Sequence, residues 1–357
     1  MLVKYPSVTD LFPEEERVEI RADTGFFSTS CYRLFGIVDY VNAFRKFPKI
    51  VDTSFGYSLY KETLGEAAHL FFKSKLAPQV DYPIVVGDPS DPFINDPAYI
   101  TFSDYKRLNF KQITPIIDAY FGIADTAEKR KEEFLQKYNI DPVNTIVAYY
   151  RGTDKKTETF LASHQVFDEK VRQIRQKYPN HKLLIQTDDP YFQQFMSERH
   201  QDAIFIKEFC PTPVKKRLIT KSGRTLLSCS ALPRVVRGAY TKLQTPQEKC
   251  THVINLLAVV KIMSECHQVI MTSGNVGLWV CLLRGSADGL CCYLNTEYLF
   301  GDKNPYYDPY KSFWSDETKP MPYPQHQNQD ALKEAREILQ EHRNFIGAVI
   351  AKQRGAL

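Results

Sequence analysis

Residues 145–159 read TIVAYYRGTDKKTET, and the rest of the chain can be interpreted from this stretch. Ile146–Tyr150 is an apolar run of the length and β-rich composition expected for a buried strand of a parallel sheet. It ends abruptly in the charged segment that begins at Arg151. Open α/β sheets bind ligands just beyond the carboxyl ends of such strands. The stretch therefore predicts a ligand-binding loop, although a solvated strand-to-helix loop with ordinary salt bridges has the same pattern.

The second half of the chain continues this alternation of strands and helices. Strands are expected at 182–186, 203–206, 268–271 and 291–294, and helices at 166–177, 191–198, 245–266 and 276–284. Two of these strands end in TDD (187–189) and TSGN (272–275). Because parallel strands deliver their carboxyl ends to one edge of a sheet, both segments should lie beside the loop that begins at Arg151.

Arg151 and Gly274 together suit a diphosphate group. The guanidinium is a planar fork of donors that matches phosphate, and Gly152 beside it allows the backbone to come close to a ligand. Gly274 precedes a helix, whose first amides carry partial positive charge. The sequence thus predicts a diphosphate site without a metal. Ser273–Asn275 could equally be an ordinary helix cap, and Asp188 could cap the helix after Pro190 or hold Arg151.

The first half opens like the βαβ unit of a doubly wound layer. Arg17–Ala22 and Ile50–Ser54 have the pattern of strands, and Cys31–Phe47 has apolar residues at helical spacing. A helix is expected from Thr114, as its cap, to Gly122, and a capping box at Asp125 should open another to about Tyr138.

Length and composition indicate a globular protein with more than one domain. The chain has 357 residues, 43% hydrophobic and 25% charged, and a net charge of +4 that is too small to argue for a nucleic-acid partner. We expect an N-terminal α/β domain at 1–142, a C-terminal α/β domain at 143–328, and a helix at 329–357 that packs back on the first domain. Residues 211–247 contain eight lysines or arginines and no acid, so this long basic loop is either functional or simply solvated.

Several classes of site are disfavoured by missing motifs. The sequence has no GxGxxG after a strand, no GxxxxGK[ST], no GxSxG and no HExxH. Its eight cysteines include no CxxC pair, so a structural metal is not expected and the thiols should be reduced. No signal peptide and no run of 18 apolar residues is found, so we expect no membrane span and a cytoplasmic location.

Three segments of the second half resemble motifs of one enzyme superfamily. YYRGTDK (149–155) resembles the HxRRTDK motif of α1,6-fucosyltransferases and protein O-fucosyltransferases. TDDP (187–190) resembles the next motif, and 269–276 is similar to the TFSS segment that precedes a helix. Order and spacing agree over roughly 130 residues. The first half looks more like glycosyltransferases encoded by large DNA viruses of algae and protists, in which case the cytoplasm would be that of a host.

The resemblance implies a GT-B-like fold, two Rossmann-like α/β domains facing a central cleft, and an inverting, metal-independent sugar transfer with no cofactor. It implies that Arg151 grips the donor diphosphate and that Glu158, or else Asp154, is the catalytic base. Further residues expected at the nucleotide sugar are Gly152, Lys155, Asp188, Asp189, Thr272, Ser273, Gly274 and Asn275, together with Gly25, Phe26 and Phe27 from the loop at 23–28.

The departures from the motif bear on the donor. The second arginine of the motif is Gly152, so one cation is missing, and Arg224, Arg234 or Arg237 of the basic loop could replace it. The acid that would read guanine falls near Val259, where none stands. The missing acid argues against GDP as the nucleotide. The resemblance otherwise implies transfer of a sugar, with fucose favoured, from a nucleoside diphosphate donor, GDP- or UDP-linked, to a hydroxyl of a glycan or glycoprotein. A UDP-linked glucose or xylose donor is one alternative, and a non-catalytic protein that binds polyanions or carbohydrate is another.

Overall fold

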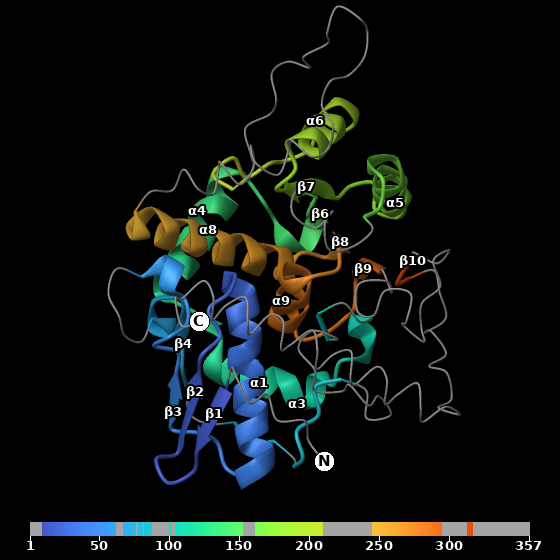
Figure 1. Cartoon of the computed structure of the whole chain (residues 1–357). Helices are drawn as coiled ribbons and strands as arrows, with labels where there is room; N and C mark the ends of the chain where they lie inside the picture. Colours follow the sequence, from blue (N-terminus) through green and yellow to red (C-terminus); the bar gives the residue numbers. More distant parts are fainter. Residues whose placement is uncertain are drawn as a thin grey trace, which may run out of the picture.

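The computed structural model describes residues 9–61, 67–75, 78–80, 82–87, 100–101, 104–152, 161–209, 245–294 and 313–316. Within these ranges the chain forms a three-stranded sheet, a five-stranded sheet and a two-stranded pair, with helices packed against them (Figure 1). The mixed α/β architecture expected from the sequence is therefore confirmed. The basic loop and the expected C-terminal helix lie outside the described residues.

The first sheet has the order β1-β2-β3, from β1 (Thr9–Phe12), β2 (Arg17–Ile20) and β3 (Ile50–Asp52). β2 and β3 are parallel and joined through helix α1 (Phe26–Phe44), which confirms the expected βαβ opening. β1 pairs antiparallel with β2 and is not among the strands expected from the sequence. The helix begins at Phe26 rather than Cys31, so the expected loop at 23–28 is wrong in its second half.

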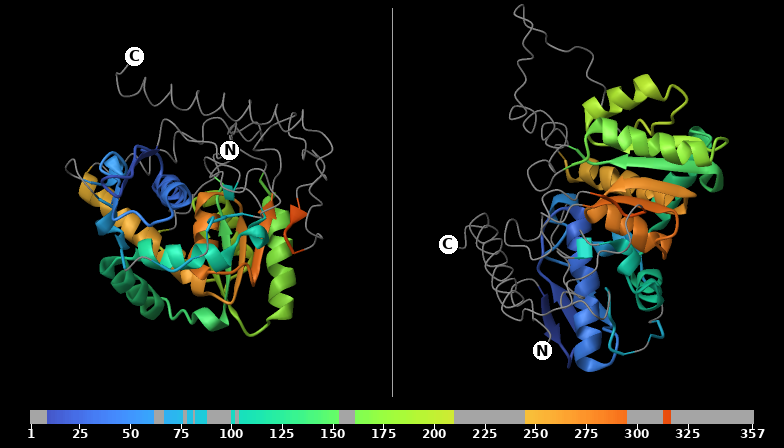
Figure 2. Two further views of the ribbon diagram at one scale, coloured as in Figure 1. Left: turned by 90° about the horizontal axis from the view of Figure 1, so that it is seen from below. Right: turned by 90° about the vertical axis from the view of Figure 1, so that its right-hand side faces the viewer.

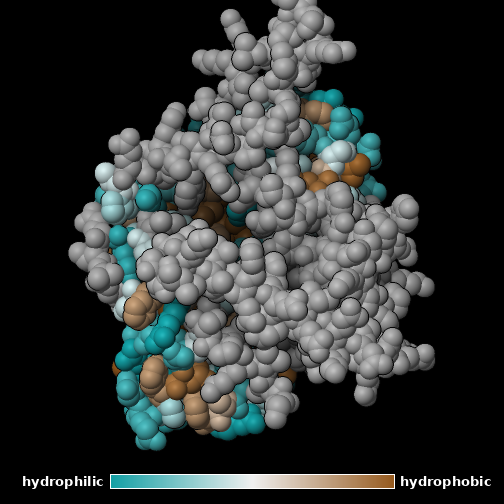
Figure 3. Space-filling view, viewed as in Figure 1, coloured by the Kyte–Doolittle hydropathy of each residue, from teal (hydrophilic) through white to brown (hydrophobic). Residues whose placement is uncertain are grey.

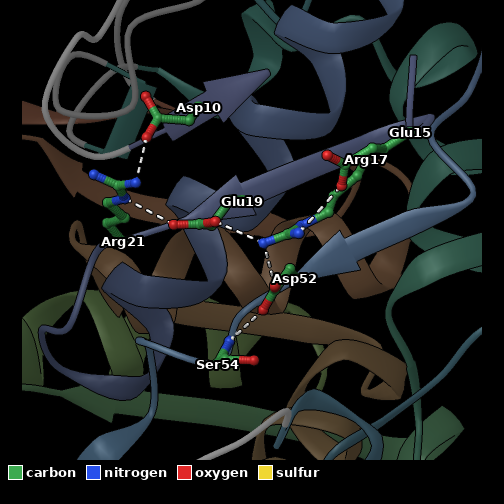
Figure 4. Close-up of polar contacts among 7 residues, drawn as sticks. All are labelled: Asp10, Glu15, Arg17, Glu19, Arg21, Asp52 and Ser54. Carbon is green, nitrogen blue, oxygen red and sulfur yellow. Dashed lines mark hydrogen bonds and ion pairs between the residues drawn. The ribbon is translucent and has the colours of Figure 1, made fainter. Parts of the chain in front are cut away.

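A row of charges lies on the face of this sheet opposite α1, since residues of a strand alternate between its two faces. The register places Asp10, Glu19 and Asp52 side by side on three adjacent strands. Arg17 joins Glu19 and Asp52 at 2.7 and 2.9 Å, and Arg21 joins Glu19 and Asp10 at 2.7 and 2.9 Å (Figure 4). The two guanidinium groups thus offset carboxylates that would otherwise repel one another.

Asp52 should stabilise the fold at neutral pH and lose this effect in acid. Burial raises the pKa of Asp52, but hydrogen bonds from Ser54 and the charge of Arg17 outweigh it, and the net shift is downward. Because the folded pKa lies below the unfolded value of about 3.9, the stabilisation is present above that value and is lost as the pH falls through the folded pKa. We expect Asp52→Asn to lower the free energy of unfolding by about 1–2 kcal/mol at neutral pH.

Urea unfolding at neutral pH and at about pH 3 measures the free energy of unfolding of wild type and of Asp52→Asn. The difference between the two proteins should be smaller at the acid pH. The matched control is Asp125→Asn, because Asp125 pairs with Lys73 on the exposed surface. A constant difference between wild type and Asp52→Asn at both pH values would contradict the prediction.

The described residues between the two sheets depart from expectation at two helix starts. The first helix begins at Phe110, not Thr114, and contains Pro115 in its second turn, where the ring costs one intrahelical hydrogen bond. The expected capping box at Asp125 is also absent, because Ala124 is the N-cap and makes no side-chain hydrogen bond. The elements here are η1 (Ser58–Tyr60), η2 (Ala68–Leu70), β4 (Phe72–Lys73), η3 (Tyr105–Arg107), α3 (Phe110–Tyr120), β5 (Gly122–Ile123), α4 (Asp125–Lys137) and η4 (Pro142–Asn144).

The second sheet has the order β10-β9-β8-β6-β7, and only the edge strand β10 is antiparallel to its neighbour. Its strands are β6 (Thr145–Tyr150), β7 (Lys182–Thr187), β8 (Gln268–Thr272), β9 (Leu290–Leu294) and β10 (Phe313–Trp314), and its helices are α5 (His164–Lys177), α6 (Pro190–Arg199), α8 (Pro246–Glu265) and α9 (Asn275–Arg284). The expected strand at 203–206 is reduced to a single bridge between Ile204 and Leu184. The predicted capping box of Thr245 and Glu248 is confirmed.

Both faces of this sheet are covered, and β6 shows why its sequence is apolar throughout. Ile146, Ala148 and Tyr150 pack in the cluster that includes α5 and α6, whereas Val147 and Tyr149 pack in the cluster that includes α8 and α9. Figure 2 shows the same layering, with the sheet between the two pairs of helices. A strand buried on both faces cannot alternate between apolar and polar residues.

One apolar core joins the two halves of the chain. Trp279 of α9 stacks on Phe27 of α1 at 5.8 Å and on Phe72 at 6.1 Å, and it lies 5.0 Å from Phe121. The largest cluster of buried residues accordingly contains residues of α1 and α3 as well as of α8 and α9. The expected domain limits at 142 and 328 remain a prediction.

In Figure 3, the described residues at the lower left of the surface include both hydrophilic and hydrophobic ones. Among the helices in the described ranges, none combines the length and the hydropathy needed to cross a bilayer.

Candidate functional site

The ends of three parallel strands lie side by side, as the sequence predicts. β6 runs between β7 and β8, and its last residue Tyr150 is paired with Thr187, the last residue of β7. On the other side, the backbone amide of Arg151 donates to Oγ1 of Thr272 at 3.3 Å. The loop after β6 therefore starts next to the end of β8, just before helix α9.

The two aspartates after β7 have different roles at this edge. Asp189 is the N-cap of α6, since its Oδ1 accepts from the amides of Tyr191 (2.9 Å) and Phe192 (3.3 Å). Oδ1 of Asp188 instead accepts from the amide of Gly152 at 2.8 Å, and its Oδ2 lies 3.8 Å from Nε of Arg151. Of the two roles open for Asp188, the structure supports the one in which it holds the Arg151–Gly152 turn.

Arg151 remains accessible to a ligand. Its side chain is 28% exposed, and its Nε lies 3.8 Å from Oδ2 of Asp188. The planar guanidinium has the geometry that suits a phosphate oxygen pair.

Gly152 is enclosed so tightly that no other residue fits without a shift. A Cβ at this position would lie 2.6 Å from Oδ2 of Asp189 and 2.6 Å from a ring carbon of Tyr150. The second arginine of the resembling motif thus has no room here. The space that its side chain would enter contains the carboxylate that caps α6.

Gly274 has a backbone conformation that favours glycine, with φ 133° and ψ 178°. Its amide donates to the hydroxyl of Tyr105 at 3.2 Å, and the amide of Ser273 donates to the carbonyl of Tyr293 at 3.3 Å. Neither amide is therefore available to a ligand. Among residues 273–278, the amides for which the described structure shows no partner are those of the first turn of α9, residues 275–277.

The side chain of Asn275 is anchored by the first half of the chain. Its Oδ1 accepts from the hydroxyl of Thr101 at 3.2 Å and from the thiol of Cys31 at 3.8 Å. Burial raises the pKa of Cys31 to about 12, although hydrogen bonds to Trp279 and Thr101 partly oppose this, so the thiol keeps its proton at neutral pH. With Oδ1 held in this way, the Nδ2 group of Asn275 is the donor that this side chain can offer to an anion.

The N-terminus of helix α1 lies near the N-terminus of helix α9, since Cys31 of α1 contacts Asn275. Gly25 is its N-cap, and a Cβ there would meet no atom within 4 Å. Phe26 and Phe27 are each only 4% exposed, and Trp279 donates to the carbonyl of Phe27 at 3.1 Å. Their rings belong to the core, so any contact of these two residues with a ligand would use their backbone amides.

The remaining predicted site residues lie outside the described ranges. They are Asp154, Lys155 and Glu158 of the loop after β6, and Arg224, Arg234 and Arg237 of the basic loop. Within the described residues, no group of three or more histidine, cysteine, aspartate or glutamate side chains could hold a metal ion.

Three residues of the site carried no recognisable signal in the sequence. Tyr105 and Thr101 come from a stretch without clear periodicity, yet both contact the start of α9. His164 begins α5, and its Nε2 lies 3.8 Å from Oδ2 of Asp189 while its ring packs against Tyr150. Only the fold brings these residues to the strand ends, because their partners are far away in the sequence.

Comparisons with known proteins give a likeness to solved structures alone. No family model and no curated protein matches the sequence. The structure is similar to crystal structures of NodZ α-1,6-fucosyltransferase, each 12% identical to this chain. The crystal soaked with GDP-fucose has a TM-score of 0.45 over 82% of this chain and 96% of that chain. The crystal grown with GDP has a TM-score of 0.43 over 78% of this chain and 93% of that chain. The structure of NodZ from Bradyrhizobium has a TM-score of 0.38 over 75% of this chain and 92% of that chain.

Proposed function

We propose that this chain is a GT-B-like inverting glycosyltransferase that needs no metal. It would move a sugar, with fucose favoured, from a nucleoside diphosphate to a hydroxyl of a glycan or glycoprotein. One observation carries the proposal. The backbone amide of Arg151, whose side chain is 28% exposed, donates to Oγ1 of Thr272, which lies three residues before the start of α9. A cation and a helix N-terminus at one sheet edge suit a diphosphate.

The chemistry needs stabilisation of the leaving group. Breaking the bond between sugar and phosphate leaves negative charge on the diphosphate, and donors already in place stabilise this charge more as the bond breaks. Arg151, the amides of residues 275–277 and Nδ2 of Asn275 would act in this way. One such preorganised donor is typically worth about 3–4 kcal/mol of barrier.

The acceptor hydroxyl needs a base on the opposite face of the sugar ring. By the resemblance, Glu158 is the first candidate and Asp154 the second, and one carboxylate is sufficient for an inverting reaction. Lys155 and the arginines of the basic loop would supply further positive charge near the phosphates, where the motif has lost its second arginine.

The nucleobase is the open part of the proposal. Val259, near which the resemblance would put an acid that reads guanine, is completely buried in α8 and offers no polar group. GDP-fucose is the donor to test first, and a UDP-linked glucose or xylose is the alternative.

A thermal-shift screen with GDP, GDP-fucose, UDP, UDP-glucose and UDP-xylose tests the proposal. One nucleoside diphosphate and its sugar should raise the melting temperature by roughly 3–4 °C at a concentration of about 100 times Kd. Adding magnesium or EDTA should not change this rise. A response to UDP and none to GDP would exclude fucose as the sugar.

A second assay separates the enzyme from a binding protein. Incubating wild type with the donor that gives a shift and with mixed glycan acceptors should release free nucleoside diphosphate. If no nucleotide shifts the melting temperature, and heparin binds in a strongly salt-dependent way, the non-catalytic polyanion-binding alternative holds instead.

A further inference from the structure

A single buried hydroxyl, that of Tyr105, lies 3.2 Å from both backbone polar atoms of Gly274 and accepts a hydrogen bond from its amide. It also lies 2.8 Å from the carbonyl of Thr101, to which its one proton is best placed to go. Tyr105 is 2% exposed, and burial raises its pKa well above the usual value, so the hydroxyl stays protonated.

The conformation of Gly274 decides where the first turn of α9 points. Gly274 is the last residue before the helix, and its φ of 133° gives no backbone preference for one orientation, since glycine has no side chain to restrict it. A contact from another segment can favour the orientation seen here, in addition to the packing of the buried residues of α9. Tyr105 supplies it from the first half of the chain.

The same segment holds the next residue as well. Thr101, whose carbonyl Tyr105 contacts, donates through its own hydroxyl to Oδ1 of Asn275 at 3.2 Å. Gly277 of α9 also lies close to the Tyr105 hydroxyl, because a Cβ on Gly277 would lie 3.4 Å from it. Thr101 and Tyr105 thus contact two consecutive residues at the start of α9, Asn275 and Gly274.

We propose that Tyr105 is a positioning residue for the donor diphosphate. Its hydroxyl holds the Gly274 peptide so that the amides of residues 275–277 face the leaving group. This inference rests on the proposed function. It adds that Tyr105, together with Thr101, sets the geometry of the diphosphate contacts, although both are distant in sequence from every motif of the site.

The test is Tyr105→Phe, which keeps the ring and removes the hydroxyl. The Gly274 amide would lose its partner, and we expect the Kd for the nucleoside diphosphate and the KM for the donor sugar to rise about 10-fold. The KM for the acceptor should not change. Calorimetric titration of the nucleoside diphosphate and steady-state kinetics with each substrate varied give these values.

The matched control is Tyr40→Phe. Tyr40 is also completely buried, on α1, and its hydroxyl has no hydrogen-bond partner in the described structure. Removing this hydroxyl should leave donor binding and both KM values as in wild type. Urea unfolding of both variants separates a loss of binding from a loss of stability.

Each outcome decides something different. If wild type binds the nucleoside diphosphate and Tyr105→Phe binds it equally well, the positioning role is overturned and the proposed function stands. A rise in the donor KM matched by an equal rise in the acceptor KM would also overturn it, since that pattern indicates general damage. If wild type binds no nucleoside diphosphate, the proposed function and this inference fall together.

Discussion

Replacing Arg151 with alanine is expected to lower the rate of sugar transfer by at least about 100-fold while the protein remains folded. The guanidinium would stabilise charge that develops only as the sugar leaves, and loss of one preorganised donor typically costs a factor of about 100–1000 in kcat. Stability should change little, because the side chain is 28% exposed and ion pairs of partly exposed groups contribute little to stability. Initial rates and the thermal unfolding curve measure the two effects separately.

Two further variants show whether the geometry of Arg151 matters. Arg151→Lys keeps the charge and loses the planar fork, so its rate should lie between those of wild type and Arg151→Ala. Arg130→Ala is the surface control, since Arg130 forms an exposed pair with Glu133 on α4 and should leave transfer unchanged. Wild-type turnover by Arg151→Ala would remove the main support of the proposed function.

The second large effect is expected from the smallest possible change, Gly152→Ala. The added methyl group would lie 2.6 Å from Oδ2 of Asp189 and from the ring of Tyr150, and Tyr150 is 2% exposed and stacked on Phe192 at 4.2 Å. Since the ring cannot move, either Asp189 leaves the N-terminus of α6 or the turn at Arg151 shifts. We expect a loss of about 1–3 kcal/mol in unfolding free energy and about 100-fold in transfer rate.

Gly122→Ala is the matched control for this variant. A Cβ at Gly122 would make only ordinary contacts, the nearest at 3.8 Å from the carbonyl of Lys73. Its stability should fall by about 1 kcal/mol or less, and its transfer rate should match wild type. If Gly152→Ala retains both stability and activity, the close approach of Asp189 does not constrain the site.

The strands and the strand-end site could be predicted because their signals are local. An unbroken apolar run such as Ile146–Tyr150 identifies a strand buried on both faces, and a change from apolar to charged residues marks its end. The order of the motifs then placed Arg151 near the end of β8. The capping box predicted at Thr245 is present. The one predicted at Asp125 is absent, because Ala124 is the N-cap of that helix.

The missed features depend on contacts between distant parts of the chain. Tyr105 contacts Gly274 across 169 residues, and Thr101 contacts Asn275 across 174. No periodicity or motif in one segment can report a partner in another. Nothing in the sequence indicated that the rings of Phe26 and Phe27 are buried in the core, where Phe27 stacks on Trp279, so any contact with a nucleotide sugar remains a prediction for their backbone amides.

The aromatic cluster around Trp279 limits how this protein can move. Hinge bending between the halves would pull Trp279 away from Phe27 and Phe72 and expose several buried rings to water. That cost does not arise in proteins whose lobes meet through a wet, polar interface. The two halves should therefore keep their relative orientation when a ligand binds.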